Sequence, residues 1–81
     1  MASGADIVVD ARGHRCPTPT LRLRRAIEQA PPGVVIMLLA DDPLARLDVP
    51  HFAGQIGAEI LSVADGESGM AFRVRKPAQS N

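Results

Sequence analysis

The chain has 81 residues, a formal net charge of zero and only 2% aromatic residues, with neither Trp nor Tyr. This length predicts one domain over residues 1–81, with an ordered core over about residues 6–76 and frayed ends. The lack of aromatic residues argues against nucleic-acid binding by base stacking, and the balanced charge leaves no global field that would attract a polyanion.

The cysteine count limits the chemistry further. Cys16 is the only cysteine, so no disulfide can form within the chain, and one Cys with two His is too few ligands for a structural zinc site. The longest apolar run, residues 34–40, is far shorter than the roughly 18 to 20 residues that span a bilayer. We therefore expect a cytoplasmic protein with no membrane contact, no metal and no cofactor.

The first half of the chain predicts a strand, a helix and a second strand. Residues 7–9 are a β-branched run, typical of a short strand that is buried on both faces. Between Pro17 and Ala30, apolar residues recur at helical spacing and predict a helix that ends at the following Pro-Pro-Gly. The apolar face consists of Leu23, Ala26, Ile27 and Ala30. Residues 34–40 then predict a central strand covered on both sides.

The second half predicts a loop, a helix and a hairpin. The helix is expected over residues 49–56, with Asp48 as its N-cap and Gly57 as its left-handed end, after a turn that Asp42 caps. Two strands, 58–64 and 70–76, form the hairpin. Met70, Phe72 and Val74 are expected to face the core, and Arg73 and Arg75 to face water.

The order β-α-β-α-β-β predicts an α+β fold, a two-layer sandwich with two helices packed on one face of a four-stranded mixed sheet. The uncovered face of that sheet is then expected to be partly hydrophobic and to offer a surface for a partner or for self-association.

Cys16 is expected to have three features that favour its thiolate form: a helix N-terminus, neighbouring cations and some exposure to solvent. Pro17 suits the first helical position, so Cys16 is expected to be the N-cap at the positive end of the helix. Pro19 stiffens the first turn. No acid lies between Asp10 and Glu28, although that interval is rich in basic residues. These are Arg12, His14, Arg15, Arg22, Arg24 and Arg25. The pattern still leaves two interpretations open: a reactive thiol, or a small apolar residue at a helix start.

Other polar residues have two interpretations each. Arg22 and Arg25 form either a solvated helix face or a docking patch for an acidic partner. His14 is either a neutral loop substitution or a residue whose charge changes near neutral pH. Asp41 and Asp42 are expected to form a turn rather than a metal site. His51 is expected to lie on the surface of the second helix.

Two segments resemble the TusA (SirA-like) family of sulfur carriers and sulfurtransferases. "RGHRCPTPTLRLRRAI" is similar to the family's Cys-Pro-x-Pro motif at the start of the first helix, and "ADDPLARLDVPHFAGQIGAEI" to its second block. The resemblance implies the same two-layer fold and a persulfide carried on Cys16, with Pro17 and Pro19 completing the motif. Arg12 or Arg15 would then stabilise the persulfide anion. Some members have a second cysteine where this chain has Ala53, so we expect one-thiol chemistry here.

The resemblance also implies partner proteins. A cysteine desulfurase or a rhodanese would supply the sulfur, and a downstream protein of tRNA thiolation, molybdenum cofactor synthesis or sulfur oxidation would accept it. The alternative is a regulatory or adaptor module in which Cys16 is only a helix cap. A redox sensor is a weaker third hypothesis, because the chain has no second, resolving cysteine.

Overall fold

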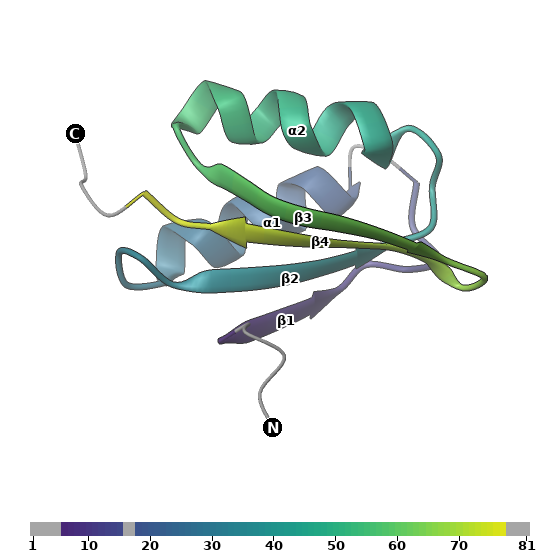
Figure 1. Cartoon of the computed structure of the whole chain (residues 1–81), viewed down its shortest axis with the longest axis horizontal. Coiled ribbons are helices and arrows are strands. Elements are labelled where there is room, and N and C mark those ends of the chain that lie inside the picture. Colours follow the sequence, from purple (N-terminus) through teal and green to yellow (C-terminus); the bar gives the residue numbers. More distant parts are fainter. Residues whose placement is uncertain (1–5, 16–17, 78–81) are drawn as a thin grey trace.

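The structure, a computed structural model, describes residues 6–15 and 18–77 (Figure 1). Strands and helices alternate along the chain until a final hairpin, in the predicted order. The elements are β1 (Ile7–Asp10), α1 (Thr18–Gln29), β2 (Val35–Ala40), α2 (Ala45–Ile56), β3 (Glu59–Gly66) and β4 (Gly69–Arg75).

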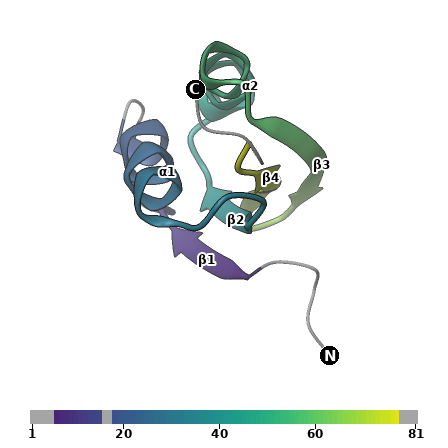
Figure 2. The same cartoon turned by 90° about the vertical axis from the view of Figure 1, so that its left-hand side faces the viewer.

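The four strands form one mixed sheet in the order β1-β2-β4-β3. β1 runs parallel to β2, whereas β4 is antiparallel to both of its neighbours. Both helices lie on one face of the sheet, and no helix of the described chain lies on the other (Figure 2). The predicted α+β sandwich is therefore confirmed.

The core lies between the two helices and the covered face of the sheet. Alternate residues of β2 and β4 point into it, because successive side chains of a strand face opposite sides. Its largest side chains are Leu23, Ile27, Ile36, Leu38, Val49, Phe52, Met70, Phe72 and Val74. The predicted apolar face of the first helix and the inward positions of the last strand are confirmed.

β1 and β2 are covered on one face only, so the expectation that both faces would be buried is wrong. Val8 is 61% exposed, and its register partner Met37 is only partly buried, as is Leu39. Since both helices pack against the same side, no element of the described chain remains to cover the other. The open face is consequently partly hydrophobic, as expected.

α2 begins at Ala45, so the prediction that Asp48 is its N-cap is wrong. Asp48 lies in the first turn, and Leu44 occupies the cap position. The Asp42 carboxylate accepts the Leu44 N–H at 3.0 Å, so the turn expected before the helix leads directly into it. Ala45 and Val49 are fully buried and lie four residues apart on one helical face, which accounts for the earlier start.

Pro50 therefore lies inside α2, where it is exposed to solvent. A proline at this position has no N–H to donate to the carbonyl of Arg46. At the other end of the helix, Gly57 adopts a left-handed conformation with φ of 75°, as predicted.

The final hairpin is longer than predicted, because its strands extend until Gly66 pairs with Gly69. Gly69 has a φ of 128°, and a Cβ there would lie 2.5 Å from the carbonyl oxygen of Ala40. Arg73, expected to face water, is partly buried, and its Nε has no hydrogen-bond partner among the described residues. Arg75 is exposed, as predicted.

Candidate functional site

The Cys-Pro-x-Pro motif, residues 16–19, lies where the β1–α1 connection leads into the first turn of α1. The structure describes this connection up to Arg15 and again from Thr18, so Cys16 and Pro17 lie outside the described residues. Pro19 lies in the first turn of α1, where it is fully buried. The site is therefore described through the residues on either side of Cys16.

The β1–α1 loop, residues 11–15 as described here, is fastened to the end of β2. The Ala11 N–H donates to the carbonyl of Leu39 at 2.8 Å and so continues the pairing of the two strands. The Gly13 N–H donates to both carboxylate oxygens of Asp41, each at 3.0 Å. Gly13 has a φ of 86°, a conformation that glycine adopts without steric strain.

Asp41 therefore has a role that the sequence did not indicate. The sequence predicts that Asp41 and Asp42 both belong to a turn. Asp42 does form such a turn, by accepting the N–H of Leu44. Asp41 instead accepts a hydrogen bond from a residue 28 positions away. The only available signal was that both loops follow strands, since the carboxyl ends of parallel neighbouring strands meet at one edge of a sheet.

Arg12 is paired with Asp10 rather than free to face the sulfur. Its Nε and Nη2 donate to the two carboxylate oxygens at 2.9 and 2.8 Å, and its backbone N–H donates to Oδ1 at 3.1 Å. These bonds, from the guanidinium first and the amide second, lower the pKa of Asp10 from its ordinary value of 3.8 to about 2. The positive charge of Arg12 is thus largely balanced by Asp10 at the end of β1.

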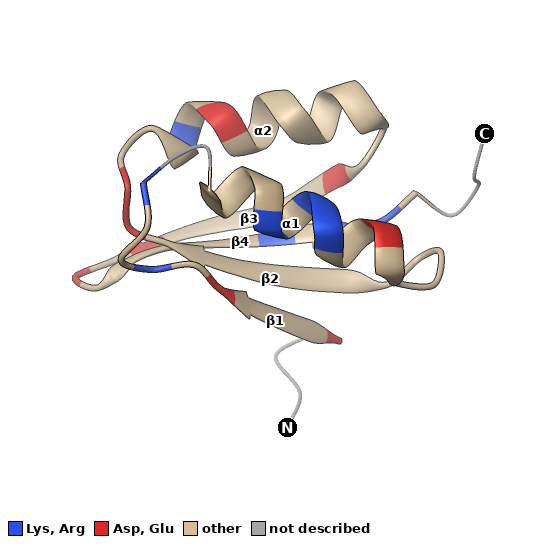
Figure 3. Cartoon of the chain, turned by 180° about the vertical axis from the view of Figure 1, so that it is seen from behind, with Lys and Arg blue, Asp and Glu red and all other residues tan. Residues whose placement is uncertain are grey.

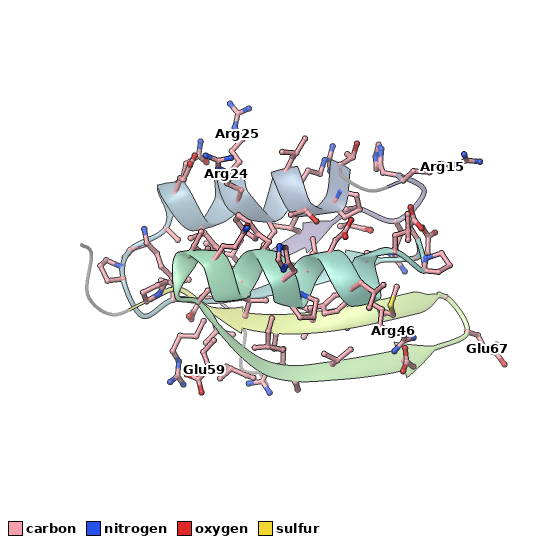
Figure 4. The ribbon with its side chains drawn as sticks, turned by 90° about the horizontal axis from the view of Figure 1, so that it is seen from above. Arg15, Arg24, Arg25, Arg46, Glu59 and Glu67 are labelled. Atoms are coloured by element: carbon pink, nitrogen blue, oxygen red, sulfur yellow. The ribbon has the colours of Figure 1, made fainter. Side chains whose placement is uncertain are left out.

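Arg15 has no side-chain partner among the described residues, and its guanidinium points away from the body of the protein (Figure 4). Arg15 is also one of the residues that line a hollow of about 440 Å³ between the β1–α1 loop and the start of α2. The lining residues are Gly13, His14, Arg15, Asp41, Asp42, Pro43 and Leu44. Of the two arginines expected to support Cys16, Arg15 is therefore the one whose charge has no partner within residues 6–15 and 18–77.

Basic residues lie along α1 (Figure 3), and two of its arginines, Arg22 and Arg24, have hydrogen-bond partners. Arg22 donates to the backbone carbonyl of Asp10 at 3.1 Å, which ties the helix to the end of β1. Arg24 forms an exposed ion pair with Glu28 at 3.3 Å. Arg25 extends outward from the helix and is exposed (Figure 4). In the predicted docking patch, Arg25 is available to a partner, whereas Arg22 has a structural contact.

Another exposed ion pair links α2 to the hairpin. Arg46 donates to both carboxylate oxygens of Asp65, the shorter bond measuring 2.6 Å. This hydrogen bonding lowers the pKa of Asp65 below its ordinary value. The pair holds the first turn of α2 over the end of β3.

The described residues contain no group of three or more His, Cys, Asp or Glu side chains that could hold a metal ion. In the same residues, no helix combines the length and the apolar character needed to cross a membrane.

In a comparison with known protein families, one family model matches nearly the whole chain. The family model described as sulfurtransferase TusA matches residues 7–76. The matched range runs from the start of β1 to just beyond β4 and includes Cys16.

Individual relatives agree with this match. A putative sulfur carrier protein of Archaeoglobus fulgidus is 39% identical over 62 residues, which cover 76% of this chain and 80% of the relative. The sulfur carrier protein TusA of Pseudomonas aeruginosa is 30% identical over 78 residues, which cover 96% of this chain and 99% of the relative.

A solved structure has the same fold. The crystal structure of a SirA-like protein from Desulfitobacterium hafniense superposes with a TM-score of 0.71 at 26% identity. The superposition covers 85% of this chain and 93% of the other.

Proposed function

Because the chain belongs to the sulfurtransferase TusA family, we propose that it is a sulfur carrier that holds sulfane sulfur as a persulfide on Cys16. The observation that carries this proposal is the family match over residues 7–76, which includes the only cysteine of the chain. The names of the relatives, which are sulfur carrier proteins, support the same role.

The transfer requires a thiolate and a donor persulfide. Cys16 first releases its proton to solvent, and its sulfur then attacks the terminal sulfur of the donor. A new S–S bond forms on Cys16 while the donor's S–S bond breaks, and the donor leaves as a thiolate. In the second transfer, an acceptor thiolate attacks the terminal sulfur of the Cys16 persulfide, and Cys16 leaves as a thiolate. Neither transfer consumes an external oxidant or reductant.

The surroundings of Cys16 favour the anionic forms of this cycle. α1 begins at Thr18 with no acidic residue in its first turn, so its positive end adjoins the motif. An anion beside an exposed helix start gains on the order of 0.3 to 1 kcal/mol. Arg15, directly before Cys16 in the sequence, adds a positive charge that no described residue balances, whereas the charge of Arg12 is balanced by Asp10. We therefore assign the supporting role to Arg15 ahead of Arg12.

The partners follow from the chemistry of a carrier. A cysteine desulfurase or a rhodanese is the proposed donor, and a relay protein of tRNA thiolation, molybdenum cofactor synthesis or sulfur oxidation is the proposed acceptor. Arg25 is exposed on α1 and suits a contact with an acidic partner surface.

The proposal is tested by loading the protein with a cysteine desulfurase and cysteine and recording its intact mass. We expect the mass to rise by one sulfur atom, on the peptide that contains Cys16, and the Cys16→Ser variant to show no increase. Failure of the wild-type protein to gain sulfur from either a desulfurase or a rhodanese would reject the proposal.

The open face of the sheet favours one alternative, an adaptor module. Val8, Met37 and Leu39 give this face an apolar character suited to a protein contact. An adaptor would keep its cellular function in the Cys16→Ser variant, whereas a sulfur carrier would lose it.

A further inference from the structure

We propose that Asp41 is a positioning residue for sulfur transfer, which acts through Gly13 on the loop that presents Cys16. The inference rests on the proposed function and deepens it, because it concerns the same site. It starts from the two 3.0 Å bonds between the Gly13 N–H and the carboxylate of Asp41.

These bonds differ from the other contacts that hold the β1–α1 loop. The amides of Ala11, Arg12 and His14 bond to the adjoining strands or to the loop itself. Among the hydrogen bonds of residues 11–15 in the described chain, the Gly13 pair is the one made by a side chain from another loop. Asp41 therefore links the loop that leads to Cys16 with the loop that leads into α2.

The link acts close to the reacting sulfur. Three residue steps separate Gly13 from Cys16, and each step spans at most about 3.6 Å, so a shift of Gly13 is passed on within a short reach. Gly13 also has a positive φ, a conformation that flexible glycine leaves easily once its amide is released. A bond from an amide to a charged carboxylate is stronger than one between neutral groups. Removing Asp41 should loosen the approach of Cys16 to the donor while leaving the core of the fold in place.

The test compares the variants Asp41→Ala and Asp41→Asn with the wild-type protein in desulfurase loading. We expect Asp41→Ala to lower kcat on the order of fivefold and to leave KM unchanged. A fivefold change in rate corresponds to the net free energy of about one hydrogen bond. Asp41→Asn keeps an oxygen that can accept the Gly13 N–H, so it should retain more of the rate. Glu67→Ala is the matched control, because Glu67 is an exposed acid in the hairpin turn and points away from the protein (Figure 4).

A purely structural role would have a different signature. It would lower the unfolding temperature of Asp41→Ala but leave kcat at the wild-type value well below that temperature, and this result would overturn the inference. A rise in KM alone would also overturn it, because it would assign Asp41 to partner binding.

The pH profile of iodoacetamide labelling separates the inference from the proposed function. Cys16 is the only thiol, so labelling reports on it even if the protein accepts no sulfur. We expect the profile of Asp41→Ala to differ from those of wild type and Glu67→Ala, and identical profiles in all three would contradict the positioning role.

Discussion

Asp10 is the last residue of β1, and its carboxylate balances the positive charge of Arg12. The guanidinium and amide of Arg12 hold the pKa of Asp10 at about 2, below its ordinary value of 3.8. Because the pKa is lower in the folded than in the unfolded state, the stability that Asp10 contributes is complete above about pH 4 and is lost as the pH falls towards 2. We expect an NMR titration to place the midpoint of this carboxyl group near the lower value.

Arg12→Gln should return the midpoint of Asp10 towards 3.8, since it removes the largest cause of the shift. A midpoint that stays near 2 in this variant would show that the ion pair is not what lowers it. Replacing both partners, Asp10→Asn with Arg12→Gln, should leave sulfur loading of Cys16 nearly unchanged, because the pair as a whole carries no net charge.

Among single residues, the sequence predicted chemical types better than contacts. The Cys-Pro-x-Pro motif and the neighbouring arginines are visible in it, and the resemblance assigned their role. The pairing of Arg12 with Asp10 and the bond from Gly13 to Asp41 are not visible, because they depend on how two loops meet. Such contacts require the register of the sheet and not only the order of its strands.

At the scale of elements, the backbone of the hairpin at Gly69 lies close to the end of β2. A Cβ at this position would lie 2.5 Å from the backbone carbonyl oxygen of Ala40, and the φ of 128° is unsuited to other residues. We therefore expect Gly69→Ala to lower the free energy of unfolding by at least about 1 kcal/mol, as measured by urea denaturation.

Gly54→Ala is the matched control for this prediction. Gly54 lies in α2, and a Cβ there meets nothing within 4 Å. Alanine is the better helix former, so this substitution should raise stability by about 0.5 to 1 kcal/mol. Equal effects of the two substitutions would mean that the close approach at Gly69 is not limiting.

Element boundaries explain where the sequence interpretation failed. Periodicity correctly predicted α1, because Leu23 and Ile27 lie four residues apart on one helical face and are buried in the core. In the second helix, Asp48 before Val-Pro looked like a start signal, yet burial of Ala45 and the turn at Asp42 begin the helix earlier. Local signals were outweighed there by packing against the sheet.

For the whole molecule, the one-sided core makes a clear prediction for two adjacent leucines of β2. Leu38 is fully buried on the covered face, whereas Leu39 is only partly buried on the open face. Leu38→Ala should lower the free energy of unfolding by about 2 to 5 kcal/mol, and Leu39→Ala by about 1 kcal/mol or less. Urea denaturation of both variants would measure the difference, and similar losses would contradict a core on one face only.

The overall architecture was predictable because six short elements of this order and length have few ways to bury their apolar faces. Which strand faces stay open was not predictable, since an apolar run such as β2 looks the same whether one or both faces are covered. The motif of the site was predictable from the sequence. The hydrogen bonds that join the β1–α1 loop to Leu39 and Asp41 were not.

In the proposed function, Cys16 accepts a sulfur atom and gives it up again. The most direct test follows the intact mass of the protein through one cycle: loading by a cysteine desulfurase, removal of the donor, and release of sulfane sulfur to cyanide as thiocyanate. We expect a gain of one sulfur atom, its complete loss with a matching yield of thiocyanate, and neither step in Cys16→Ser. A protein that gains no sulfur, or whose added sulfur cannot be released, would contradict it.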